Sequence, residues 1–226
     1  MKIAVLGTGV VGQALAGRLA ELGHEVTVGT RDVGATMART GPDRMGNPPM
    51  RAWAAAHPTA QLATFADATS TAELVVNGTS GTISIAALTA AGADNLAGKV
   101  VLDISNPLDF SQGFPPTLFV KDTDSLGEQI QAAFPQAKVV KALNTLTAAL
   151  MVNPKLLADG AHSVFLSGND AEAKKSVTGL LESFGHTDVI DLGDISTARG
   201  TEMVLPLWLR VMGSLNTPMF NFKIVR

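Results

Sequence analysis

A glycine-rich segment close to the N-terminus carries the clearest chemical signal of the sequence. It has the G-x-G-x-x-G spacing, follows the apolar run 3–6 directly, and consists of Gly7, Thr8, Gly9, Val10, Val11 and Gly12. The first glycine permits a tight turn, the second lets the backbone approach a pyrophosphate, and the third lets a helix pack on the strand. The free N–H groups at the start of that helix would bind the pyrophosphate. These residues predict a dinucleotide site, with a glycine-rich turn that binds nothing as the alternative.

The end of the next apolar run decides which nicotinamide dinucleotide fits. An NAD site places Asp or Glu about 20 residues beyond the glycines, where the carboxylate binds the ribose 2′-hydroxyl. This sequence has Thr30 and Arg31 there, and its first carboxylate is Asp32. A hydroxyl and a guanidinium suit a 2′-phosphate, which a carboxylate would repel. Thr30 and Arg31 therefore predict NADP(H); in the rival interpretation Asp32 binds the ribose and Arg31 stacks on the adenine.

Polar and turn-forming residues follow two more of the expected strands. Asn77, Gly78 and Thr79 come after one of them, and Asn106 and Pro107 come after the next. Ligands of open α/β sheets bind outside the carboxyl ends of the strands. We therefore expect both segments to border the ribose and the nicotinamide of the cofactor. Ordinary turn chemistry is the alternative, since Asn, Gly and Pro are common in turns.

The elements that would position these residues alternate along the chain. Short apolar runs predict strands over Lys2–Leu6, Glu25–Val28, Gln61–Thr64, Glu73–Asn77, Lys99–Ile104 and Lys138–Ala142. Amphipathic stretches between them predict helices over Val10–Leu22, Pro49–Ala56, Ile83–Ala91 and Leu126–Phe134. Continuous apolar runs are typical of parallel strands that are buried on both faces. The alternation predicts an α/β fold of the Rossmann type, with a doubly wound parallel sheet.

Two segments interrupt this alternation. Residues 105–125 contain three prolines and no periodicity, and a loop of that length is usually functional, for example as a lid. Beyond residue 146 the sequence predicts a strand over His162–Ser167, a helix over Ala171–Phe184, a strand over Thr187–Asp191 and an apolar helix over Thr201–Leu215. We expect a dinucleotide-binding domain over residues 1–146. Residues 147–226 would form a small C-terminal α+β cap domain for substrate binding or dimerisation.

Composition excludes several classes of protein. Hydrophobic residues make up 46% of the 226 residues and charged residues 16%, so a disordered chain is excluded. The net charge of −3 shows no basic excess, which argues against nucleic acid and membrane surfaces as partners. The chain has no cysteine, which excludes disulfides and thiolate metal sites. The four histidines form no metal-type pair, and His24 and His186 are expected to be exposed. We expect a cytoplasmic protein with a small-molecule substrate and no bound metal.

The C-terminal segment is apolar beyond what one helix face requires. It contains Trp208, Met212, Met219, Phe220 and Phe222. These side chains form either ordinary core or the seam of a homodimer that also walls a ring pocket. The small share of charged residues favours the seam.

Three segments of the sequence resemble one known family. MKIAVLGTGVVGQALAGRLAELGHEVTVGTRD over Met1–Asp32, KVVKALNTLTAALM over Lys138–Met151 and the closing stretch Ser196–Arg226 are similar to the coenzyme F420-dependent NADP oxidoreductases. The resemblance implies a Rossmann domain, a small C-terminal domain and a homodimer. It also implies an oxidoreductase that transfers a hydride between NADP(H) and a deazaflavin, coenzyme F420, or a similar flat redox partner.

The resemblance assigns roles to residues at both ends of the site. Thr8, Thr30 and Arg31 match the pattern that binds the NADP phosphate. At the substrate face, residues 77–80 and the loop 105–125 depart from the family pattern. Related Rossmann domains also form part of flavin-using ferric reductases, without F420.

On the ring side, the resemblance points to a short segment of the second half of the chain. Asn144, Thr145 and Leu146 fall where the family has residues beside the nicotinamide and deazaflavin rings. Asn144 and Leu146 are therefore candidate catalytic residues, and Asn144 is also a candidate cofactor contact. Arg199 matches the start of a helix that borders the deazaflavin site and is the third catalytic candidate.

Two other functions stay open at this point. An NADPH-dependent reductase of a small carbonyl, imine or flavin substrate would need a proton donor for the first two, and Lys141 is the candidate. A dinucleotide-binding sensor would bind NADPH without turnover. Among the acids, we expect a structural role for Asp103. Glu202 would either stabilise the first turn of its helix or orient Arg199.

Overall fold

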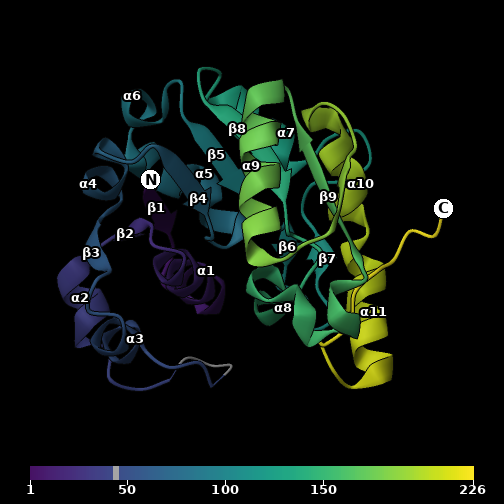
Figure 1. Ribbon diagram of the computed structural model, residues 1–226, viewed down its shortest axis with the longest axis horizontal. Helices are drawn as coiled ribbons and strands as arrows, with labels where there is room; N and C mark the ends of the chain where they lie inside the picture. The colour runs from purple at the N-terminus through teal and green to yellow at the C-terminus, as the bar shows by residue number, and fades with distance from the viewer. Residues whose placement is uncertain (43–45) are drawn as a thin grey trace.

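One mixed sheet organises the protein, for which the computed structural model describes residues 1–42 and 46–226. The strands of this sheet lie in the order β10-β9-β8-β5-β4-β1-β2-β3 (Figure 1). Their bounds are Lys2–Leu6 for β1, Glu25–Thr30 for β2, Gln61–Thr64 for β3, Leu74–Asn77 for β4, Val100–Asp103 for β5, Lys138–Ala142 for β8, Ser163–Gly168 for β9 and Asp188–Asp191 for β10. The six strands β8, β5, β4, β1, β2 and β3 are parallel to their neighbours. They lie in the order expected of a dinucleotide-binding Rossmann sheet. The predicted fold class is confirmed.

Helices cover both faces of this sheet. One face carries α1 (Val10–Glu21), α3 (Met50–Ala56), α8 (Ala148–Val152) and α9 (Ala171–Phe184). The other carries α4 (Phe65–Ser70), α5 (Gly81–Ala91), α6 (Ala93–Leu96) and α7 (Leu126–Ala133). The short helix α2 (Val33–Ala38) follows β2, and α10 (Ala198–Met203) and α11 (Leu205–Leu215) close the chain.

The strands read as unbroken apolar runs because each of their faces contributes to a separate core. In β1, Ile3 and Val5 belong to the core beneath α1, whereas Ala4 and Leu6 belong to the core beneath α4 and α5. All four side chains are at most 1% exposed. Burial on both faces removes the polar alternation of a half-exposed strand. This arrangement aligns the carboxyl ends of the parallel strands along one edge, where the predicted site residues lie.

The C-terminal part of the chain extends the same sheet. β9 runs antiparallel to β8, and β10 runs parallel to β9. Val164 and Val177, beyond residue 146, share a core with Ile3 of β1. The division into two domains at residue 146 stays a prediction. The single helix predicted over Thr201–Leu215 is wrong. The structure has α10 and α11 instead, and Pro206 lies in the first turn of α11, where its missing N–H is tolerated.

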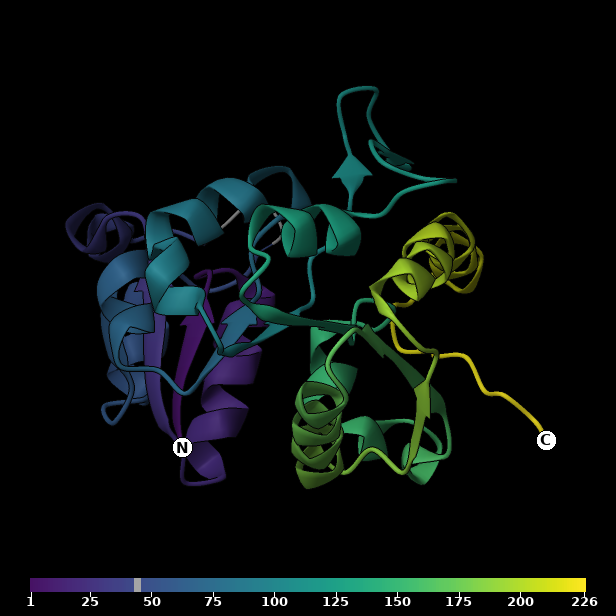
Figure 2. The same cartoon turned by 90° about the horizontal axis from the view of Figure 1, so that it is seen from above.

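The proline-rich loop over 105–125 contains a small hairpin. It consists of β6 (Leu108–Asp109) and β7 (Thr117–Leu118), which pair antiparallel. The hairpin stands away from the body of the protein, above the carboxyl edge of the sheet (Figure 2). Phe110 and Phe114 are 58% and 65% exposed near its tip. No described helix is long and apolar enough to span a bilayer.

A buried ion cluster joins the C-terminal helices to the carboxyl edge of the sheet. The side chain of Lys141, on β8, is 1% exposed, and its Nζ lies 2.8 Å from the carboxylates of both Asp103 and Glu202. Nζ also donates to the carbonyl of Ser105 at 2.5 Å. Glu202, on α10, accepts the backbone N–H groups of Leu126 and Gly127 at the start of α7. One cation therefore ties β5, β8, α7 and α10 together.

Replacing Lys141 with Met should destabilise the protein strongly. The substitution leaves two carboxylates buried without their cation, which typically costs about 3–5 kcal/mol of unfolding free energy. Urea denaturation followed by circular dichroism measures this loss.

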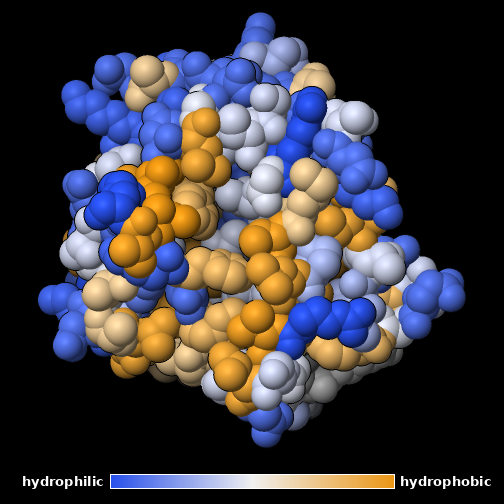
Figure 3. Space-filling model, turned by 90° about the vertical axis from the view of Figure 1, so that its right-hand side faces the viewer, coloured by the Kyte–Doolittle hydropathy of each residue, from blue (hydrophilic) through white to orange (hydrophobic). Residues whose placement is uncertain are grey.

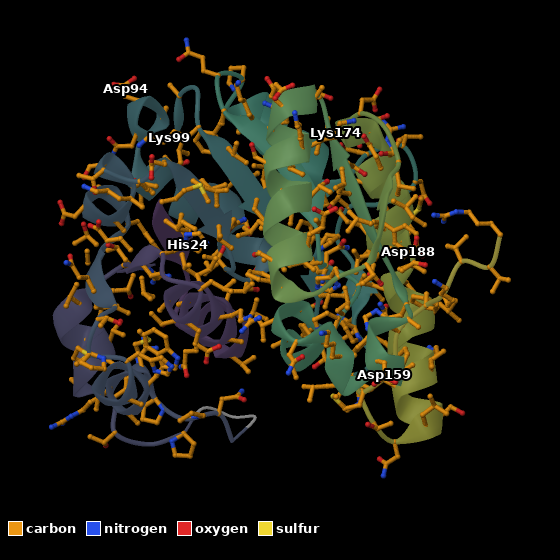
Figure 4. The ribbon with its side chains drawn as sticks, viewed as in Figure 1. His24, Asp94, Lys99, Asp159, Lys174 and Asp188 are labelled. Atoms are coloured by element: carbon orange, nitrogen blue, oxygen red, sulfur yellow. The ribbon has the colours of Figure 1, made fainter. Side chains whose placement is uncertain are left out.

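Lys174→Met is the matched control. Lys174 lies on α9 (Figure 4) and pairs with Asp191; their side chains are 16% and 52% exposed. A pair of that kind contributes about 1 kcal/mol or less. Equal and small losses for both variants would contradict the importance of the Lys141 cluster.

Candidate functional site

A cavity of about 380 Å³ lies at the carboxyl ends of β1, β2 and β4. Seven of the predicted cofactor contacts line it, namely Gly7, Thr8, Gly9, Thr30, Arg31, Gly78 and Thr79. They come from three strand ends that are distant in sequence but adjacent in the sheet. The structure therefore brings together the glycine loop, the end of β2 and the end of β4.

The three glycines of the loop have different surroundings. A Cβ on Gly12 would lie 2.0 Å from the carbonyl oxygen of Gly7, so α1 could not pack on β1. Gly7 has a φ of +113°, and its Cβ would lie 2.8 Å from the carbonyl oxygen of Gly78. A Cβ on Gly9 would meet no atom within 4 Å. Gly9 is thus free of steric demands from the protein itself, and its small size leaves room for a ligand.

The start of α1 presents unpaired donors beside this open space. Gly9 is the N-cap, and no side chain of the described residues caps the helix there. The first N–H groups of a helix lack partners within the helix, and together with the helix dipole they attract anions. The loop therefore fits a dinucleotide pyrophosphate. Val10 and Val11 belong to the first turn, with Val10 40% exposed.

The end of β2 forms the polar wall of the cavity. The hydroxyl groups of Thr30 and Thr36 lie 2.8 Å apart and are buried, whereas Arg31 is exposed. A carboxylate oxygen of Asp32 accepts the N–H of Ala35 at 2.8 Å and so caps α2. This hydrogen bond holds the carboxylate in a structural role, which favours the assignment of the ribose contacts to Thr30 and Arg31 rather than to Asp32.

Sequence reasoning missed the cavity residues contributed by α2. Thr36 and Arg39 both line the cavity, and neither was expected there. The segment 33–38 gave no helical pattern because it is only six residues long. The Asp32 cap was the signal that could have located it, since Asp favours the N-cap position.

The predicted contacts after β4 have two different positions. Gly78 and Thr79 line the cavity, but Asn77 lies beneath it and is 0% exposed. Asn77 donates to Asp103 at 2.8 Å and accepts from the hydroxyl of Thr79 at 2.7 Å. Its amide therefore has protein partners and connects the ligand-facing Thr79 to the Lys141 cluster.

The ends of β5 and β8 are joined by a reciprocal amide pair. Asn106 donates to the backbone carbonyl of Asn144 at 2.8 Å, and the side chain of Asn144 donates to that of Asn106 at 3.1 Å. Asn144 also donates to the carbonyl of Thr201 on α10. Pro107 and Leu146 are buried nearby in sequence. Asn144 thus connects both strand ends to the C-terminal helices, away from the residues that line the 380 Å³ cavity.

The third catalytic candidate is engaged in an ion pair. Arg199 makes two hydrogen bonds to Glu128 on α7, at 2.8 and 2.5 Å. The hypothesis that Glu202 orients Arg199 is wrong, and Glu202 does not act on its own first turn either. It is committed to Lys141 and to the start of α7. The catalytic role of Arg199 stays a prediction.

The electrostatics of Lys141 make it a poor proton donor. Burial alone would lower the pKa of its ammonium, but Asp103 and Glu202 outweigh this effect and raise that pKa above its usual value. An acid with a raised pKa gives up its proton less readily near neutral pH. With Nζ enclosed by Asp103, Glu202 and Ser105, the structure gives little support to carbonyl or imine reduction through Lys141.

Two other sequence expectations meet the structure away from the cavity. The prediction that His186 is exposed is wrong. The residue is 3% exposed, and burial lowers the pKa of its imidazole.

The apolar residues of the C-terminal segment pack partly on one another, since Trp208 stacks on Phe220 with ring centroids 5.1 Å apart. Apolar side chains gather over the face that carries the C-terminal helices (Figure 3), where Leu207 and Leu215 are 54% and 56% exposed. A homodimer through this face stays a prediction.

Comparisons with known sequences point to one family. The model of the family described as NADP oxidoreductase, coenzyme F420-dependent, matches residues 2–107. The F420-dependent NADP reductase of Methanocaldococcus jannaschii is 31% identical over 115 residues, which cover 50% of this chain and 51% of that protein. The metalloreductase STEAP3 of Rattus norvegicus is 29% identical over 214 residues, 92% of this chain and 38% of that protein. The chain thus spans between about a third and a half of the length of these relatives.

A solved structure agrees with this result over the full length. A protein of Arthrobacter sp. FB24, provisionally assigned as an F420-dependent NADP reductase, is 64% identical with a TM-score of 0.96, and the match covers 100% of both chains. Residues 2–107 contain the glycine loop and the strand ends that form the cavity. The chain belongs to the coenzyme F420-dependent NADP oxidoreductase family, whose members are NADP-dependent oxidoreductases.

Proposed function

We propose that this protein transfers a hydride between NADP(H) and a deazaflavin of the coenzyme F420 type. The observation that carries the proposal is the cavity at the ends of β1, β2 and β4, which combines a free helix start with Thr30 and Arg31. The former fits a pyrophosphate and the latter a 2′-phosphate. Family membership supports both the dinucleotide and the type of reaction.

The residues of the chain would divide the work of binding between the two ends of the dinucleotide. The N–H groups at the start of α1 would hold the pyrophosphate, and Thr30 and Arg31 the phosphorylated ribose. NADP(H) supplies the carbon that gives or accepts the hydride. Residues beyond the cavity, around Asn106 and Asn144, would orient the ring and keep water away from it. Such a transfer needs two reacting carbons held roughly 3–3.5 Å apart rather than a protein nucleophile.

The acceptor is tested by measuring oxidation of NADPH and of NADH with and without F420. We expect F420-dependent oxidation of NADPH and at least tenfold slower oxidation of NADH, because a charge-assisted hydrogen bond to a phosphate contributes about 1.5–3 kcal/mol. Arg31→Ala should remove most of this preference. Rapid oxidation of NADPH by a flavin with ferric iron, but not by F420, would replace the deazaflavin with the acceptor type suggested by the metalloreductase relative. Tight binding without any turnover would favour a sensor.

Two glycine variants separate ligand binding from folding. Gly9→Ala should leave the free energy of unfolding nearly unchanged, because its Cβ meets nothing within 4 Å. It should weaken NADPH binding by about tenfold or more, since the methyl group occupies the path of the pyrophosphate. Gly12→Ala should reduce thermal stability, because its Cβ would lie 2.0 Å from the carbonyl oxygen of Gly7. Unchanged NADPH affinity in a folded Gly9→Ala variant would argue against the proposed pyrophosphate position.

Asn144→Ala tests the ring side of the site. The variant loses the hydrogen bonds to Asn106 and Thr201, so the strand ends and α10 lose their fixed spacing. We expect kcat to fall by about 10–100-fold, because small misplacements of reacting groups are costly. The dissociation constant for NADPH should change less than threefold, which stopped-flow fluorescence can measure alongside single-turnover rates. A large loss of affinity with unchanged kcat would contradict the assignment.

A further inference from the structure

Arg39 occupies a position that no sequence motif indicated. It is the C-cap residue of α2, and its side chain is exposed. It lines the 380 Å³ cavity and also an adjoining cavity of about 570 Å³. Thr8 and Thr36 border both cavities as well. Arg39 therefore stands where the two spaces meet, on the side of the site that begins at the end of β2.

The guanidinium of Arg39 has no partner within the part of the chain that the structure describes. Throughout residues 1–42 and 46–226 it makes no hydrogen bond or ion pair, whereas Arg18 and Arg199 pair with Glu21 and Glu128. Arg31, the other arginine of the 380 Å³ cavity, is equally unpaired within that part of the chain. Two free guanidinium groups thus border one cavity.

The remaining polar groups of this wall do not neutralise the two arginines. Asp32 is the acid that lines the cavity, and one of its oxygens caps α2. Thr30 and Thr36 contribute hydroxyl groups that are hydrogen-bonded to each other and buried. Counted over residues 1–42 and 46–226, the wall therefore carries two positive charges against one negative charge, beside neutral hydrogen-bonding groups. Such a wall attracts an anion with more than one negative charge.

We propose that Arg39 is a specificity-determining residue, which binds the ribose 2′-phosphate together with Arg31. This inference rests on the proposed NADP(H) function and adds a second cation to its selectivity. The pyrophosphate is the other candidate anion, but it already has the unpaired N–H groups at the start of α1. A guanidinium offers several N–H donors in a fixed plane, and the donors of two guanidinium groups in one cavity suit the oxygens of a phosphate dianion.

The test compares ligands that differ only in the 2′-phosphate. Isothermal titration calorimetry gives the dissociation constants of NADPH, NADH, 2′,5′-ADP and 5′-ADP for the unmodified protein, Arg39→Ala and Arg39→Lys. Arg51→Ala is the matched control, since Arg51 is exposed on α3 and lines neither cavity.

Arg39→Ala should weaken NADPH and 2′,5′-ADP by about tenfold and leave NADH and 5′-ADP within twofold. Arg39→Lys should give an intermediate loss, because it keeps the charge but not the planar donors. The loss should shrink at high salt, where exposed charges are screened. Arg51→Ala should change none of these constants by more than twofold.

Three results would overturn the proposal. If Arg39→Ala weakens the binding of NADPH and NADH equally, Arg39 contacts the pyrophosphate instead. If the affinity for NADPH does not change, Arg39 is not part of the site. If Arg51→Ala has the same effect as Arg39→Ala, the effect comes from the overall charge of the protein.

Arg31→Ala separates failure of this proposal from failure of the proposed function. If Arg31→Ala abolishes NADPH preference while Arg39→Ala has no effect, only the role of Arg39 falls. If the unmodified protein does not distinguish NADPH from NADH, the NADP(H) proposal itself fails.

Discussion

The ammonium of Lys141 is the interaction on which the arrangement of the site depends. It is a single cation between two carboxylates, all of them at most 1% exposed. The excess negative charge is offset by neutral donors: Asn77 and Ser105 donate to Asp103, and the start of α7 donates to Glu202. Removing water from three charges is favourable only when all their hydrogen bonds are made. The cluster therefore forms only when β4, β5, β8, α7 and α10 take one arrangement relative to one another.

The two ends of the site are built on different principles. At the phosphate end, backbone geometry is decisive, because the Gly7 carbonyl leaves no room for a side chain at position 12 and the start of α1 is left uncapped. At the end where we propose the ring binds, the Asn106–Asn144 pair fixes the spacing between strand ends through side chains. A backbone cradle tolerates few substitutions, whereas a side-chain frame can change its ligand by changing residues. The first end suits a constant cofactor and the second a variable partner.

Local patterns were sufficient to predict the first end. The glycine spacing, the apolar runs and the residues that follow β2 are local features of the sequence, and they predicted the fold and about half of the residues that line the cavity. The partners of Lys141 could not be found in this way, because Asp103 and Glu202 lie 38 and 61 positions away and approach it only in the folded sheet. Arg39 was missed for a related reason. It enters the cavity because Asp32 starts α2, and a six-residue helix leaves almost no periodic signal.

The division between the two ends also bears on how relatives with different activities can share one framework. The family model matches residues 2–107. This range includes the glycine loop and the ends of β2 and β4 but excludes Asn144, α10 and α11. Hydride transfer between flat rings requires a fixed distance and a dry surface more than a specific acid or base. A change in the walls around the second ring can therefore replace one acceptor with another while the dinucleotide end stays the same. The names of two relatives, an F420-dependent NADP reductase and a metalloreductase, indicate different acceptors, which such a division would allow.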